Sequence, residues 1–440
     1  MEDLDTSYAR HLAEVNKHNQ VVVSEDIYNE QGALVIASGT VLAESKVEVI
    51  AKHKLVKPLE QSVDVADSLD DKTLLAYLNK FSSSVPGLHA LIAQDDVQKI
   101  LAFCCQQYNK YPLLRQKLTV MARQMTHRYY HALFSASAGV IIAKEMQLPE
   151  EDAVTIFLAG LMHDVGMLHI PPEVCNKKGR YTPEERRVME AHPVIGKHFL
   201  DMVPNLPSAV SRAVLEHHET ALGTGYPKRK CADQLAVAGQ VIALCDLMIA
   251  YYTRYKAVEG LSKELTVTAM RLNQGLHFEK VNQAAVSALS RVNNPIPALK
   301  ELPPVQELIE SQERLKSQFD KITLLVSKLV DHIDERIKNS IMSMYDQLSV
   351  TMIRAGIFQT EFTEWLQEEG EKEGECDGLE LLKLQVMHHE VDFQFNRLLH
   401  LIWEGIEAMP TAKQKIKLVA ESYYKKMIPK ACRTPQNLVA

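Results

Sequence analysis

The sequence contains few of the residues on which secreted and membrane-spanning proteins depend. Its seven cysteines among 440 residues are odd in number and never spaced as C-x-x-C, so neither a disulfide framework nor a thiolate zinc site is indicated. No run of about 18 apolar residues occurs, and the acidic N-terminus lacks the basic-then-apolar pattern of a signal peptide. We therefore predict a cytoplasmic protein that neither spans nor binds a membrane.

Aromatic residues and excess basic charge are also scarce. Aromatic residues make up 6% of the chain, whereas Leu, Ala, Glu, Lys and Met are frequent, a composition that favours helices over β-sandwiches or barrels. The formal net charge of -7 gives no broad positive field for a phosphate backbone. The composition predicts a mainly α protein that does not bind nucleic acid, although local cations can still hold a small anion.

The chain divides into three predicted parts. Residues 1–72 contain two β-branched runs around a turn and end in an acidic stretch, which predicts a small N-terminal β module and a linker. Residues 73–300 show apolar positions at three- and four-residue spacings and predict a helical domain. Prolines at 295–304 then forbid a continuous helix, so we place a boundary there and predict a C-terminal helical region over 301–440.

The start of this C-terminal region has a regular apolar repeat. From Leu308 to Ile333 the steps alternate between four and three residues, and Gln312 is the one polar residue in the series. Such a stripe is typical of a helix packed within a bundle, and it also suits the seam of a homodimer. Residues 305–440 are thus a candidate surface for dimerisation or for a signalling partner.

Polar residues at otherwise apolar helical positions give the strongest functional signal. There are seven of them: His131, His163, Asp164, His192, His217, His218 and Asp246. Burying so many polar groups unpaired would be costly, and coordination to metal removes that cost. Imidazole and carboxylate ligands without thiolate favour iron, manganese, nickel, cobalt or zinc. Seven ligands exceed the needs of one ion, so we predict a two-ion centre with Asp164 as the bridge. Such a centre suits phosphodiester hydrolysis.

Three motifs carry a family resemblance. The His163-Asp164 doublet, the "HHE" of residues 217–219 and "GTGYP" at 223–227 resemble the HD-GYP family of bacterial cyclic di-GMP phosphodiesterases, over about residues 120–260. The resemblance implies an all-α core of the HD superfamily. It also implies that the seven polar residues hold two or three divalent ions, iron or manganese.

The resemblance further implies a reaction and its substrate contacts. Gly225, Tyr226 and Pro227 would form the loop beside the substrate groove. The expected activity is hydrolysis of cyclic di-GMP to pGpG and then GMP. In this interpretation Asp164 is the central catalytic ligand, and His192 or a water protonates the leaving 3′ oxygen.

Several positions depart from the family pattern. Met167 stands where the family has a lysine, and Leu222 stands where it commonly has an aspartate. We therefore expect activity to be reduced, and Arg254 and Lys256 become the candidate phosphate-binding residues. His127, four residues before His131, occupies the place of a glutamate that holds a third ion in some members.

These departures leave two alternatives to a phosphodiesterase. One is a signalling or binding protein that keeps its metal centre and turns over slowly or not at all. The other is an HD-type hydrolase or oxygenase that acts on another substrate.

Overall fold

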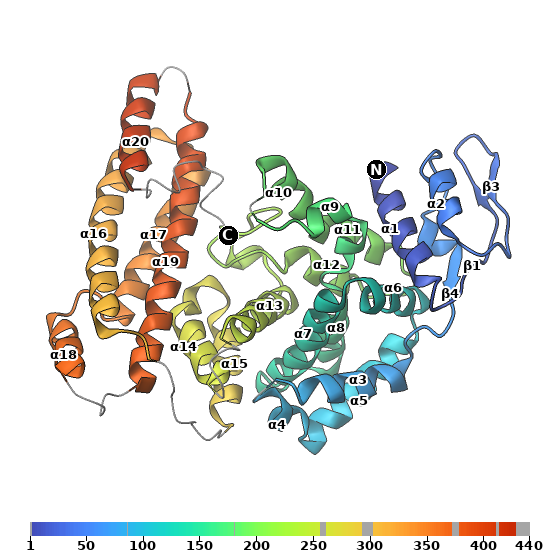
Figure 1. Cartoon of the computed structure of the whole chain (residues 1–440), viewed down its shortest axis with the longest axis horizontal. Helices are drawn as coiled ribbons and strands as arrows, with labels where there is room; N and C mark the ends of the chain where they lie inside the picture. The colour runs from blue at the N-terminus through green and yellow to red at the C-terminus, as the bar shows by residue number, and fades with distance from the viewer. Residues whose placement is uncertain are drawn as a thin grey trace.

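The structure is a computed structural model that describes residues 2–85, 87–179, 181–255, 261–292, 302–371, 378–410 and 413–427. Within these ranges it is mainly helical, with two sheets of two strands each (Figure 1), and this confirms the predicted fold class. Among the helices so described, none combines the length and the apolar character needed to cross a membrane.

The N-terminal part combines two small antiparallel sheets with a helix that the sequence pattern did not reveal. β1 pairs with β4, and β2 forms a hairpin with β3. The elements are α1 (Glu2–Val15), β1 (Val21–Val23), β2 (Ile27–Tyr28), β3 (Leu34–Ile36), α2 (Glu44–Ile50), η1 (Leu59–Gln61) and β4 (Val63–Val65). Tyr8, Leu12 and Val15 of α1 are fully buried and belong to the same apolar core as the following helices. The β module is therefore packed onto the helical domain.

The central helical domain carries the sequence motifs. Its first half contains α3 (Asp71–Ser82), α4 (Leu88–Ile92), α5 (Asp95–Asn109), α6 (Pro112–Gln124), α7 (Thr126–Glu145), α8 (Glu150–Met162), η2 (Val165–His169) and α9 (Pro172–Cys175). Its second half contains α10 (Pro183–Met189), α11 (His192–Asp201), α12 (Ser208–Glu216), η3 (Ala232–Gln234), α13 (Val237–Arg254), α14 (Ser262–Leu272), η4 (Gln274–Leu276) and α15 (Glu279–Ser290).

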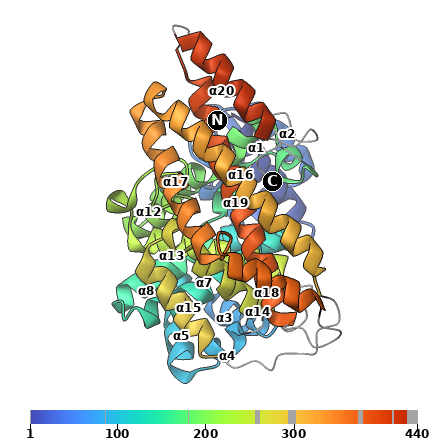
Figure 2. The ribbon, with the colours of Figure 1, turned by 90° about the vertical axis from the view of Figure 1, so that its left-hand side faces the viewer.

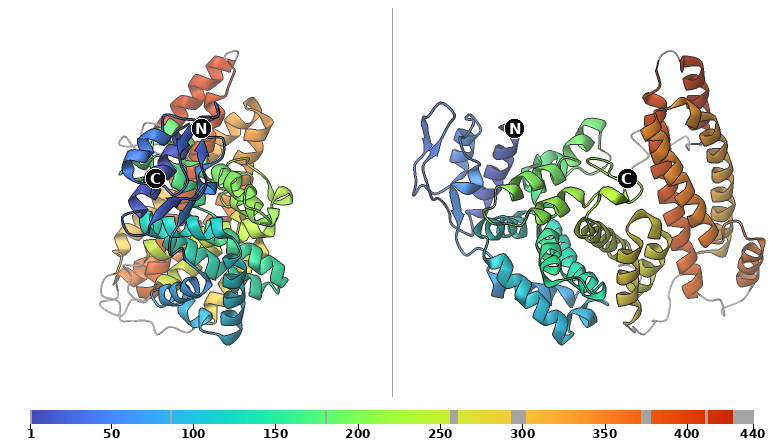
Figure 3. Two further views of the ribbon diagram at one scale, coloured as in Figure 1. Left: turned by 90° about the vertical axis from the view of Figure 1, so that its right-hand side faces the viewer. Right: turned by 180° about the vertical axis from the view of Figure 1, so that it is seen from behind.

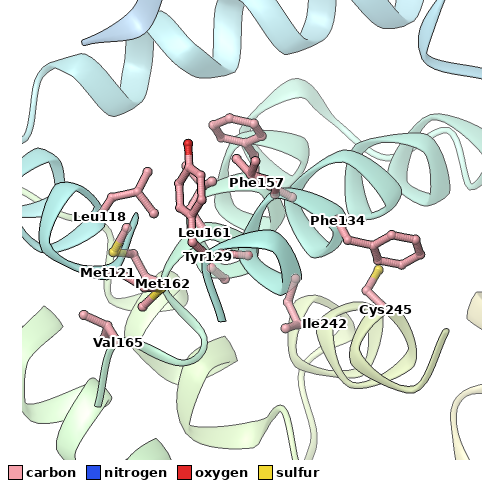
Figure 4. Packing of buried hydrophobic residues seen from close by; sticks show 14 of the residues in the cluster. Leu118, Met121, Tyr129, Phe134, Phe157, Leu161, Met162, Val165, Ile242 and Cys245 are labelled. Atoms are coloured by element: carbon pink, nitrogen blue, oxygen red, sulfur yellow. The ribbon is translucent and has the colours of Figure 1, made fainter. Parts of the chain in front are cut away.

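Helices α7 and α8 form the centre of this domain. Both are buried over most of their length, and α13 packs across them through Ile242 and Cys245 (Figure 4). A Cβ at Gly160 would lie 2.7 Å from the backbone nitrogen of Ala136, so the two helices can approach this closely only because residue 160 is glycine. The tight pair fixes the ends of both helices, where the metal-site residues lie.

The C-terminal region is a helical bundle at the far end of the molecule from the β module (Figures 1 and 3). It contains α16 (Val305–Leu329), η5 (Val330–His332), α17 (Glu335–Arg354), α18 (Thr360–Glu371), α19 (Gly378–Glu407) and α20 (Gln414–Met427). The apolar stripe of α16 packs against α19 and the other bundle helices, as expected for packing within a bundle (Figure 2). Its role as a dimer seam stays a prediction.

Candidate metal centre

Most of the predicted ligands lie where helices of the central domain begin or end, whereas His131 and Asp246 lie within α7 and α13. His163 is the C-cap of α8, Asp164 is the N-cap of η2, His192 is the first residue of α11, and His217 is the C-cap of α12. A Cβ at Gly166 would lie 2.1 Å from the carbonyl oxygen of His192, so glycine allows η2 to run directly against α11. This contact brings the His163-Asp164 doublet beside His192.

Three of the histidines are held by the same local hydrogen bond. In each case ring nitrogen Nδ1 donates to the carbonyl oxygen three residues earlier: His163 to Gly160 (2.9 Å), His192 to Met189 (2.7 Å) and His217 to Val214 (2.6 Å). A carbonyl can only accept, so the proton resides on Nδ1 and Nε2 carries a lone pair. Such backbone bonds orient metal-binding histidines and fix their tautomer.

The free nitrogens converge around Asp164. His192 Nε2 lies 3.4 Å from Asp164 Oδ1, and His163 Nε2 lies 3.5 Å from Asp164 Oδ2. The same His163 nitrogen is 3.9 Å from Oδ1 of Asp246, and Asp246 is 3.7 Å from Nδ1 of His131. The five residues thus form a continuous chain of close contacts, in the order His131, Asp246, His163, Asp164 and His192.

The donor set fits a cation. His192 Nε2 and His217 Nε2 lie 3.2 Å apart, and two facing lone pairs at that distance repel unless a proton or a metal ion lies between them. The ligand atoms of His192, His217 and His218 all lie within 4.8 Å of one another. Nε2 of His163 and both ring nitrogens of His131 are buried without a hydrogen-bond partner, and metal coordination would satisfy one nitrogen of each ring.

The electrostatics of the centre give its residues the protonation states that metal binding needs. Burial opposes ionisation of Asp164, but Arg128 and the surrounding histidines outweigh it and hold the pKa of this carboxyl well below its usual range. Burial and the neighbouring His192 lower the pKa of His218 to about 3, and burial and the neighbouring His218 hold the pKa of His217 well below its usual range. At neutral pH His217 and His218 are therefore neutral and Asp164 is ionised, the forms that coordinate a metal ion.

His127 lies beside His131 on α7. Their ring centroids are 4.2 Å apart, as their spacing of four residues predicts for one helix face. Burial lowers the pKa of His127, which favours the neutral form that a metal requires. Its role as a ligand to a third ion stays a prediction.

The predicted substrate loop adjoins this centre. The ring of Tyr226 stacks on that of His218, with centroids 4.6 Å apart, and the Tyr226 amide donates to the His218 carbonyl (3.1 Å). A Cβ at Gly225 would lie 2.2 Å from the same carbonyl oxygen, so only glycine permits this approach. Glu219, the third residue of "HHE", is buried and accepts from the amides of Lys228 (2.6 Å) and Lys230 (3.0 Å). Sequence reasoning did not assign that role.

The cations near the centre differ from those selected on sequence. Arg254 donates to Glu390 of the C-terminal bundle (2.9 Å), and Lys256 lies outside the described residues. Met167 is 2% exposed, inside the core. Arg128 was missed: its Nη1 donates to Asp164 Oδ2 at 3.0 Å, and about a third of its side chain is exposed. The available signal was its position three residues before His131, on the same face of a helix.

Histidines and aspartates from several helices thus come together in a helical domain, as in a metal-binding fold, and the comparisons identify its family. Residues 110–279 match the family model described as HD domain. A cyclic di-GMP phosphodiesterase of Pseudomonas aeruginosa is 26% identical over 234 residues, which is 52% of this chain and 55% of that protein. The HD domain of this chain belongs to the HD-GYP family.

Two further relatives show the range of this similarity. A cyclic di-GMP phosphodiesterase of Thermotoga maritima is 33% identical over 32% of this chain and 41% of its own length. A 3′3′-cGAMP-specific phosphodiesterase of Vibrio cholerae is 32% identical over 25% of either chain. The chain therefore spans about half or less of the length of these relatives.

Proposed function

We propose that this protein is a metal-dependent phosphodiesterase that hydrolyses cyclic di-GMP to pGpG and then to GMP. The observation that carries the proposal is that Nε2 of His163 and Nε2 of His192 flank the ionised Asp164, and that Nε2 of His217 lies 3.2 Å from Nε2 of His192. A backbone hydrogen bond fixes each of these three rings. The names of the relatives from Pseudomonas aeruginosa and Thermotoga maritima support the substrate.

Two divalent ions, iron or manganese, would be held by this donor set and would supply Lewis-acid chemistry and an activated water. We propose as ligands His131, His163, Asp164, His192, His217, His218 and Asp246. Asp164 is the bridging candidate because its two oxygens face different sides of the centre, Oδ1 toward His192 and Oδ2 toward His163.

His192 can serve as a metal ligand or as a proton donor, but not as both. Nδ1 of this residue is committed to the Met189 carbonyl, so Nε2 is the one nitrogen that can coordinate. A single nitrogen cannot both hold an ion and give a proton to the leaving 3′ oxygen. We therefore propose His192 as a ligand and a water as the proton donor.

Arg128 is our proposed phosphate-binding residue in place of the absent lysine. It is anchored to Asp164 through Nη1, and a guanidinium has four further N–H donors in a planar fork suited to a non-bridging phosphate oxygen. Arg254 is less suitable because Glu390 already neutralises it. On this basis the departure at Met167 weakens phosphate binding without abolishing it.

A second substrate follows from the same centre. The Vibrio cholerae relative is named for 3′3′-cGAMP, which has the same phosphodiester ring and one different base, and a centre that acts on the phosphodiester does not itself distinguish the two. We propose cyclic di-GMP first, since the names of the relatives from Pseudomonas aeruginosa and Thermotoga maritima carry it over longer alignments.

The test is hydrolysis of each dinucleotide by the full chain, loaded in turn with iron and manganese under anaerobic conditions, with products separated and metal counted. We expect pGpG and GMP together with two or three ions per chain. His192→Ala should lose metal and activity, whereas His198→Ala, an exposed histidine on the same helix α11, should keep both. Stoichiometric metal with both dinucleotides intact would refute the enzyme and favour a binding protein.

A further inference from the structure

The two ends of the loop that contains the GYP residues pair with each other, and one side of the loop contacts the metal centre. We define the GYP loop as residues 222–231. Leu222 and Cys231 form an isolated antiparallel bridge at its base, and the Ala232 amide donates to the Ala221 carbonyl (3.2 Å). The inner side is bonded to His218 and Glu219, as described above.

The outer side of the GYP loop is held by the C-terminal bundle. From α19, Glu404 accepts from Arg229 Nη2 at 2.8 and 2.7 Å, and Arg397 donates to the Thr224 hydroxyl (3.0 Å). From α17, Arg336 Nη2 donates to the carbonyl of Lys228 at 2.9 Å. Ser340 of α17 also donates to the Gly223 carbonyl at 3.5 Å, so two bundle helices bind the loop at four residues.

An apolar contact accompanies these polar ones. Leu222 packs against the apolar core of the bundle, a core that also includes Leu348, Leu398 and Ile402. An aspartate at position 222 would place a carboxylate against this apolar surface, at a desolvation cost. The packing therefore gives the departure at Leu222 a physical reason: this loop is built to meet the bundle.

We propose that the C-terminal bundle is a clamp that positions the GYP loop against the metal centre, with Arg229, Glu404 and Leu222 as positioning residues. The expected effect on substrate binding rests on the proposed function, whereas the ordering of the loop by the bundle can be measured without substrate. A loop without strands or helices loses conformational freedom when substrate binds, and contacts that order it beforehand reduce that cost.

The first test measures the loop without any substrate, by hydrogen exchange of the loop amides in the full chain. In Glu404→Gln and in Glu404→Arg we expect the amides of Tyr226, Lys228 and Lys230 to exchange about tenfold faster, since a charge-assisted hydrogen bond is lost. Adding Arg229→Glu to Glu404→Arg restores an oppositely charged pair and should recover most of the protection.

The matched control is a second ion pair of the same bundle. Arg314 and Asp392 are bonded at 2.8 and 2.7 Å between α16 and α19, away from the loop contacts. Asp392→Asn should leave exchange in the GYP loop unchanged. Equal effects of Glu404→Gln and Asp392→Asn would mean that general loosening of the bundle moves the loop, and the clamp would be overturned. Unchanged loop exchange in both Glu404 variants would overturn it as well.

The second test measures substrate use. If the clamp preorders the loop, Glu404→Gln should raise KM for cyclic di-GMP about tenfold with kcat nearly unchanged, and the charge-swapped double variant should lower KM again. Fast exchange with no activity in any variant would leave the clamp standing and refute the proposed function. Normal exchange and KM in the variants of an active enzyme would refute the clamp alone.

Discussion

Replacing the buried lysine Lys117 by methionine should destabilise the central domain and loosen the metal centre. Lys117 on α6 is fully buried, with Nζ 3.3 Å from Glu60 Oε1 and 2.8 Å from His169 Nε2. The same ammonium lies 3.2 Å from the ring centroid of Tyr8. Since His169 ends η2, the element that Asp164 begins, this cluster supports the backbone next to the central ligand.

The expected magnitude follows from the charge that the substitution leaves behind. Methionine fills a similar volume, but Glu60 is 3% exposed and would remain as a buried carboxylate without its cation. Breaking a buried pair in this way costs about 3–5 kcal/mol. For a domain of this size that corresponds to a fall in Tm of about 10 °C. Adding Glu60→Gln should recover part of the loss, because the stranded charge is removed.

The two tryptophans provide an internal control for this measurement. Trp365 and Trp403 both lie in the C-terminal bundle, so their fluorescence reports that region, whereas helical circular dichroism reports the whole chain. Lys117→Met should lower the transition seen by circular dichroism more than the one seen by fluorescence. A change in unfolding free energy below about 1 kcal/mol, or a double variant less stable than the single one, would refute the reasoning.

Three further predictions concern the centre itself. Arg128→Ala should lower kcat/KM at least about tenfold, with Arg128→Lys between it and the wild type, as steady-state kinetics on cyclic di-GMP would measure. The metal-free protein should lose stability as pH falls below 6.5. In the unfolded chain His218 binds a proton near that pH, whereas in the folded protein its pKa of about 3 keeps it neutral. This histidine alone should lower the free energy of unfolding by about 2 kcal/mol at pH 5, as denaturant titrations would measure. Chelation at neutral pH should lower Tm and manganese should restore it, unless Asp164→Ala is present, because metal binds the folded centre.

The ligand set was readable from sequence for a physical reason. Polar residues such as His163 and Asp246 interrupt apolar helical patterns, and an interruption of that kind is visible without a structure. The helical class follows from composition and periodicity in the same way. What these patterns do not contain is the orientation of each ring, which depends on where a helix ends and on which carbonyl lies three residues back.

Contacts between segments that are distant in the chain could not be predicted from the sequence. Arg128 lies one turn from His131, but nothing local shows that its guanidinium reaches Asp164, 36 residues away. Helix α1 also escaped prediction, although Tyr8 and Leu12 are fully buried. Its apolar face is recognisable only against the core that it covers, and that core includes α6 and η2, which lie about 100 residues or more further along the chain.

The departures from the family pattern at Leu222 and Met167 have different structural explanations. Where the family commonly has an aspartate, Leu222 carries no charge and packs against the apolar core of the bundle. This one difference therefore favours contact between the GYP loop and the bundle. Met167 of η2 carries no charge where the family has a lysine, and Arg128 of α7 instead places a cation beside Asp164. Neither change subtracts a metal ligand. In the proposed mechanism the full set of metal ligands is kept, and Arg128 and the bundle take over the positioning of the substrate.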